Sequence, residues 1–139
     1  YTFDLNAGYL NVSKIVGDVN IVKSFSNMTF SELVGDIKGT IDNSTFAVYN
    51  SVFDLLDVNL TNCNLDLDNV TIKNIDIVCN KVQAIFLDVY SEDIKLELNI
   101  SNLEYYNNTP KPVGNIYIKN VGSQYKINET VKHSGIKVE

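Results

Sequence analysis

The sequence predicts an all-β protein, an antiparallel β-sandwich of Ig-like or jelly-roll-like type with a protruding N-terminal strand. Apolar and polar residues alternate with a period of two, as in strands that bury one face. The β-formers Val, Ile, Tyr, Phe and Thr are abundant, whereas Ala occurs only three times and Trp is absent. Turn signals recur between the alternating segments at the spacing expected of a sandwich or barrel.

Residues 1–13 are expected to form a long amphipathic strand, and residues 14–139 a single β domain. The apolar face of the N-terminal strand is expected to consist of Phe3, Leu5, Ala7 and Tyr9. Further strands are expected over residues 15–23, 28–41, 46–56, 58–77, 82–90, 94–103, 113–121, 125–131 and 136–138. The turn signals are Gly17-Asp18, Gly35-Asp36, Asp42-Asn43, Asn80-Lys81, Ser91-Glu92-Asp93 and residues 107–112. No helix longer than a turn or two is expected.

A β-solenoid is the alternative architecture, because several segments repeat. Residues 53–77 carry Asn-Leu or similar pairs at a period of five. This stretch resembles the pentapeptide-repeat family, which implies short strands wound into a square β-helix. The segment Val16-Gly17-Asp18-Val19 recurs as Val34-Gly35-Asp36-Ile37, a period of 18, whereas the first four glycosylation signals are spaced by 16. Because these periods disagree and the repeat stops after Ile77, the sandwich is preferred.

Eight Asn-x-Ser/Thr sequons occur in the 139 residues, and none has Pro in the middle. They begin at Asn11, Asn27, Asn43, Asn59, Asn69, Asn99, Asn107 and Asn128. Random shuffling of this composition gives only about two or three such signals. In five of them the middle residue is apolar, so on a strand the Asn and the hydroxyl would face water. The excess predicts an N-glycosylated extracellular chain, although an Asn-rich composition also produces sequons by accident.

The two cysteines, Cys63 and Cys79, are 16 positions apart. In an oxidising compartment they are expected to pair, and a disulfide of this loop length stabilises a fold by about 3 kcal/mol in the chain-entropy model. The alternative is a pair of buried free thiols.

Several function classes are unexpected for this composition. The chain contains no Arg and carries a net charge of −6, so a nucleic-acid partner is not expected. No apolar run is long enough for a membrane span, and the opening Tyr1 is expected to follow a removed signal peptide.

The sequence also offers little for catalysis. The single His133, followed by Ser134, lies in a polar stretch without a nucleophile motif, so an enzyme is not expected. Asp66, Asp68 and Asn69, with Asp76 nearby, offer oxygen ligands for a hard cation, but a solvated strand face is the preferred interpretation. No metal is expected, and no cofactor other than covalent N-glycans. The eight Tyr side chains are expected to flank the core rather than to form a carbohydrate- or protein-binding surface.

The N-terminal strand Tyr1-Thr2-Phe3-Asp4-Leu5, the eight sequons, the absence of Arg and the Asn/Ile/Val/Tyr bias occur together. In this combination the chain resembles the subunits of archaeal surface threads of the Sulfolobus type. The resemblance implies an extracellular cell-surface filament that assembles by donor-strand complementation and contributes to adhesion and biofilm. Its partners would be copies of the same chain, arranged head to tail. The alternative is a monomeric secreted or surface-layer glycoprotein, or a carbohydrate-binding β module.

Overall fold

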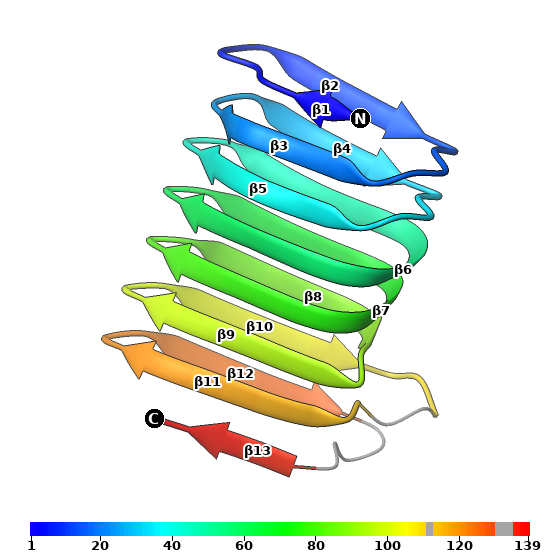
Figure 1. The fold of residues 1–139 in the computed structure, drawn as a ribbon. Helices are drawn as coiled ribbons and strands as arrows, with labels where there is room; N and C mark the ends of the chain where they lie inside the picture. The colour runs from blue at the N-terminus through cyan, green and yellow to red at the C-terminus, as the bar shows by residue number, and fades with distance from the viewer. Residues whose placement is uncertain (111–112, 130–134) are drawn as a thin grey trace.

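The computed structural model describes residues 1–110, 113–129 and 135–139, which form thirteen strands and no helix (Figure 1). In chain order the strands are β1 (Thr2–Phe3), β2 (Tyr9–Ser13), β3 (Val19–Ser24), β4 (Asn27–Ser31), β5 (Ile37–Asp42), β6 (Thr45–Thr61), β7 (Asn64–Asn80), β8 (Gln83–Tyr90), β9 (Asp93–Asn99), β10 (Asn102–Asn107), β11 (Asn115–Val121), β12 (Gln124–Glu129) and β13 (Gly135–Val138). Every pair of neighbouring strands is parallel. The all-β prediction is therefore confirmed, but the antiparallel sandwich is wrong and the alternative, a β-solenoid, is the fold.

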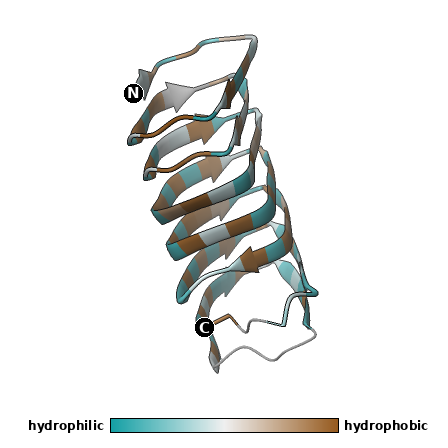
Figure 2. Ribbon diagram, turned by 90° about the vertical axis from the view of Figure 1, so that its right-hand side faces the viewer, coloured by the Kyte–Doolittle hydropathy of each residue, from teal (hydrophilic) through white to brown (hydrophobic). Residues whose placement is uncertain are grey.

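The chain winds into stacked coils whose strands form two facing sheets. The first sheet has the order β1-β3-β5-β6-β7-β9-β11-β13, and the second has the order β2-β4-β6-β7-β8-β10-β12. The long strands β6 and β7 belong to both sheets because each bends around a corner of the coil. Figure 2 shows the coils stacked along the long axis of the molecule, with apolar and polar residues alternating along the strands.

Successive coils differ in length. Val19 lies beside Ile37 in the next coil, a sequence offset of 18, whereas Ile75 lies beside Ile94, an offset of 19. The offset from Ile94 to its neighbour Ile116 is 22, because this coil includes the longer connection between β10 and β11. The period of 18 in the sequence is thus one turn of the solenoid, whereas the periods of five and 16 do not match a coil.

Inward side chains stack from coil to coil into apolar columns. One column runs through Val19, Ile37, Leu56, Ile75, Ile94 and Ile116, all of them buried. Burying such a side chain contributes about 1.5–3 kcal/mol, so the columns are the main source of stability. The alternation of apolar and polar residues in the sequence therefore arises from these columns and not from a sandwich core.

Two corners of each coil are made by residues in the left-handed conformation. One corner contains Asn43, Asn62, Lys81 and Ile100, and the other contains Glu32, Asn50, Asn69 and Asp88, all with φ between 48° and 55°. Asn and Asp tolerate this conformation better than other residues with a side chain. Directly after the first corner, the hydroxyl groups of Ser44 and Ser101 each donate a hydrogen bond to the backbone carbonyl two residues earlier. These bonds give the carbonyl groups at the corner a hydrogen-bond partner.

A third corner explains the repeated Gly-Asp pair. A Cβ on Gly35 would lie 2.0 Å from the carbonyl oxygen of Gly17 in the preceding coil, so only Gly fits. The carboxylate of Asp18 accepts a hydrogen bond from the N–H of Asp36, and the carboxylate of Asp36 accepts one from Leu55. Each Asp therefore binds the backbone of the next coil.

These corners also correct the predicted strand limits. The segment 1–13 contains two strands, and the segment 28–41 is divided into β4 and β5. Conversely, β6 continues through Asp57, where a break between strands was expected. Sequence patterns missed several corners, among them those at Glu32, Asn50 and Ile100.

Candidate functional site

The expected donor segment lies on its own chain in this structure. β1 pairs with β3 and β2 pairs with β4, so residues 1–13 form the first coil of the solenoid. Phe3 and Leu5 are half-buried against the core, whereas Ala7 and Tyr9 are exposed. The four residues therefore do not share one face, because the chain turns at Gly8, whose φ is 104°.

Five of the eight sequon asparagines are exposed. They are Asn11, Asn43, Asn59, Asn69 and Asn128. Asn11, Asn59 and Asn128 lie in strands and point outward, whereas Asn43 and Asn69 occupy corners, the second of them within the long strand β7. The Nδ2 of Asn69 donates to the Oδ1 of Asn50 at 2.8 Å. A bulky glycan needs such surface positions, so these five residues suit attachment.

The other three sequon asparagines are more constrained. Asn27 is half-buried, and its Oδ1 accepts a hydrogen bond from the N–H of Thr45 at 2.8 Å. Asn99 is half-buried, and its Nδ2 lies 3.4 Å from a carboxylate oxygen of Glu97. Asn107 is 1% exposed, and its Nδ2 is buried without a hydrogen-bond partner in the described structure. Asn107 is therefore the sequon whose position in the folded chain suits glycan attachment least.

The two cysteines are buried free thiols in the structure. Cys63 follows the corner residue Asn62, and its Sγ donates to the carbonyl oxygens of Thr61 and Ile41 at 3.1 and 3.3 Å. The thiol thus acts as Ser44 does in the preceding coil. Burial, followed by the nearby thiol of Cys63, raises the pKa of Cys79 to about 12. The disulfide stays a prediction.

Of the acidic residues considered as cation ligands, Asp66 and Asp68 lie two residues apart on one face of β7, but Asp76 does not join them. Asp66 lies in the part of β7 that belongs to the second sheet, whereas Asp76 lies in the first sheet. The hydroxyl of Tyr49 donates to Asp66 at 2.9 Å, and partial burial together with this bond raises the pKa of Tyr49. Within the described ranges, no group of three or more His, Cys, Asp or Glu side chains is arranged for a metal ion. His133 and Ser134 lie outside the described residues.

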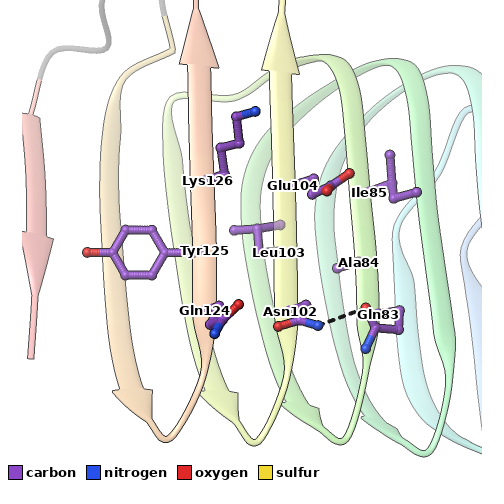
Figure 3. Close-up of a pocket in the computed structure, with 9 residues that line it drawn as sticks. All are labelled: Gln83, Ala84, Ile85, Asn102, Leu103, Glu104, Gln124, Tyr125 and Lys126. Atoms are coloured by element: carbon purple, nitrogen blue, oxygen red, sulfur yellow. Dashed lines mark hydrogen bonds between the residues drawn. The ribbon is translucent and has the colours of Figure 1, made fainter.

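A shallow groove of about 390 Å³ crosses β8, β10 and β12 (Figure 3). One side is formed by Gln83, Asn102 and Gln124, here called the amide row, in which Asn102 Nδ2 donates to Gln83 Oε1 at 3.2 Å. The other side carries Ile85, Glu104 and Lys126. Sequence reasoning missed this groove because the three amides belong to three different coils and meet only in the solenoid register.

The tyrosines that were expected to flank the core have mixed positions. Tyr105 is buried, and its hydroxyl donates to the carbonyl of Val89. Burial raises the pKa of Tyr105 above its ordinary value. Tyr9, by contrast, is 85% exposed on the second sheet.

Comparisons with protein-family models, with curated proteins and with solved structures found no match to this chain. The described residues contain no helix with the length and apolar character needed to cross a bilayer.

Proposed function

We propose that this protein is a structural subunit of an extracellular, N-glycosylated filament on the cell surface, with a role in adhesion or biofilm. The observation that carries the proposal is the position of the sequons. Five of the eight acceptor asparagines are exposed, and they are distributed over strands and corners along the solenoid. Glycans at these positions would cover the outer faces and prevent lateral pairing with other proteins.

Copies would join end to end through the edges of the sheets. Among the strands that the structure describes, β13 pairs with β11 alone. Glu139 exchanges backbone hydrogen bonds with Ile118 and Asn120, so Ile136 and Val138 direct their N–H and C=O groups away from β11. An added parallel strand would bind these groups, as in other cases of strand addition.

The N-terminal segment of a second copy suits this edge. In its own chain β1 pairs with β3, Thr2 beside Asn20 and Phe3 beside Ile21, and its other edge has no strand neighbour among the described residues. In the solenoid register, Ile21 and Val138 belong to the same inward column. Phe3 of the second copy would therefore extend the column beyond Val138 and bury further apolar surface.

A second candidate function is carbohydrate binding by a monomeric secreted module. The amide row favours this alternative, because Asn and Gln side chains donate and accept hydrogen bonds with sugar hydroxyls. Soluble glycans that bind the wild-type protein but not Asn102→Ala would support it.

The filament proposal is tested on native material by glycopeptide mass spectrometry and negative-stain electron microscopy. We expect at least four occupied sequons and filaments that disappear when residues 1–8, including β1, are deleted. The matched control is Asn59→Gln, which removes one exposed sequon and leaves the N-terminal coil unchanged. Discrete particles for the full-length protein, or normal filaments after the deletion, would refute the assembly proposal.

A further inference from the structure

Two sequons have a tyrosine beside them in the sheet. In the parallel register Asn27 of β4 lies next to Tyr9 of β2, and Asn128 of β12 lies next to Tyr106 of β10. Both pairs belong to the second sheet. The remaining sequon residues that the strands place in register have other neighbours. Asn11 lies beside Thr29, Asn59 beside Thr40 and Val78, Asn99 beside Asn80 and Val121, and Asn107 beside Glu129.

The dimensions of a sheet bring each Tyr close to the glycan attachment point. Neighbouring strands are about 4.8 Å apart, and side chains stand roughly perpendicular to the sheet. A Tyr side chain is longer than an Asn side chain, so its ring extends to the level of the first sugar on the adjacent Asn. The ring of Tyr9 is accessible, because this residue is 85% exposed.

The amide of Asn27 is already turned in the required direction. Asn27 lies between Tyr9 in the preceding coil and Thr45 in the next one. Its Oδ1 accepts the hydrogen bond from the N–H of Thr45. Because the oxygen and nitrogen occupy opposite sides of the planar amide, this bond turns Nδ2, the atom that carries a glycan, toward the Tyr9 side.

We propose that Tyr9 and Tyr106 are platforms for the first sugar of the N-glycans on Asn27 and Asn128. The apolar C–H face of an Asn-linked pyranose would pack on the aromatic ring, whose face carries partial negative charge. At the second pair, the ammonium group of Lys126 lies over the Tyr106 ring, 5.6 Å from its centroid. This inference rests on the proposed glycosylation, and it assigns two of the glycans a stabilising role on the folded surface.

The test is a double-mutant cycle in the full-length chain, expressed in a host that attaches N-glycans. Thr29→Val abolishes the sequon but leaves Asn27 and its bond to Thr45 in place, and Tyr9→Ser removes the ring. We expect loss of the Asn27 glycan to lower the thermal midpoint by about 3 °C in the Tyr9 protein and by less than about 1 °C in Y9S. Tyr9→Phe keeps the ring and is expected to retain the full shift.

The control sequon is Asn59, which has no aromatic neighbour in register. Thr61→Val removes that sequon and is expected to change the midpoint equally with or without Y9S. In the wild-type glycoprotein, nuclear Overhauser effects are expected between the Tyr9 ring protons and the first sugar. If Asn27 is glycosylated but loss of its glycan shifts the thermal midpoint equally in the Tyr9 and Y9S proteins, the role of Tyr9 is refuted and the proposed glycosylation stands. An unoccupied Asn27 would overturn it together with the glycosylation proposed at that site.

Discussion

At the scale of single residues, the most informative feature is the set of side chains with positive φ at the corners. Most of them are Asn, Asp, Glu or Lys, whereas Ile100 is β-branched and has a φ of 48°. A β-branched residue is strongly disfavoured in this conformation, at a cost of about 1–2 kcal/mol. Ile100 is also 66% exposed, so burial does not offset the cost.

Replacing Ile100 by Asn is therefore expected to stabilise the protein by about 1 kcal/mol, a rise of about 3 °C in the thermal midpoint. The same corner already contains Asn43 and Asn62 in earlier coils. Chemical denaturation and calorimetry measure the change. The reverse substitution Asn62→Ile is the matched control and should lower the free energy of unfolding by a similar amount. If neither substitution changes the free energy of unfolding, a β-branched residue at this corner is not strained.

The buried thiol of Cys79 predicts a pH dependence in the reduced protein. Burial raises the pKa of Cys79 from its ordinary value to about 12. A group with a raised pKa in the folded state stabilises the fold fully below its unfolded pKa, near pH 9, and this stabilisation is lost as the pH rises toward 12. We expect the free energy of unfolding to fall by up to about 1.4 kcal/mol per pH unit above pH 9 through this group. Denaturant titrations of Cys79→Ala should show a smaller slope, and an unchanged slope would exclude the effect.

At the scale of elements, the close approach of successive Gly-Asp corners determines how tightly the first coils stack. Gly35→Ala would place a methyl group 2.0 Å from the carbonyl oxygen of Gly17, so the coils must separate. We expect a loss of about 3 kcal/mol in the free energy of unfolding. Gly122→Ala is the matched control, because Gly122 also has positive φ but has open space around it. It should cost only about 1 kcal/mol. Equal losses would show that backbone conformation, and not the contact, dominates.

The sequence was sufficient to predict the alternation and some of the corners, but not the remaining corners or the direction of strand pairing. The turn signals at Gly17, Gly35, Asn43 and Lys81 all lie at corners of the coil. An antiparallel sandwich and a parallel solenoid both bury every second residue, so the alternation does not distinguish them. Only the recurrence of Val-Gly-Asp has the same spacing as one coil of the solenoid. Later coils are longer, so this spacing does not continue along the sequence.

The candidate sites were predictable only in part, for the same reason. A sequon is visible in the sequence, but the burial of Asn107 and the pairing of Asn27 with Tyr9 depend on the register between coils. The groove beside Asn102 combines residues from three coils, so no local motif indicates it. The corner role of Cys63 likewise appears only when its coil is aligned with the one that contains Ser44.

At the scale of the whole molecule, the solenoid concentrates its unpaired backbone at the two ends of the stack. Among the described strands each coil is paired on both sides except the outermost ones, where β1, β2, β12 and β13 have a single neighbour. The proposed outward glycans would protect the long faces, which would leave strand addition at an edge as the contact between copies of the chain. A heterologous contact of this kind does not close and produces a filament.

Val138→Pro tests this arrangement at one atom. The N–H of Val138 points away from β11, so Pro removes a donor at the edge without breaking a bond of the protein's own ladder. Losing this bond costs about 1 kcal/mol per junction, and the proline ring also obstructs the approaching strand. We expect V138P to fold normally but to form only short filaments or none, as measured by light scattering and electron microscopy. Val138→Ala controls for the lost side chain and should still polymerise, whereas Lys137→Pro should weaken the pairing of β13 with β11. Filaments of normal length from V138P would show that copies do not join at this edge.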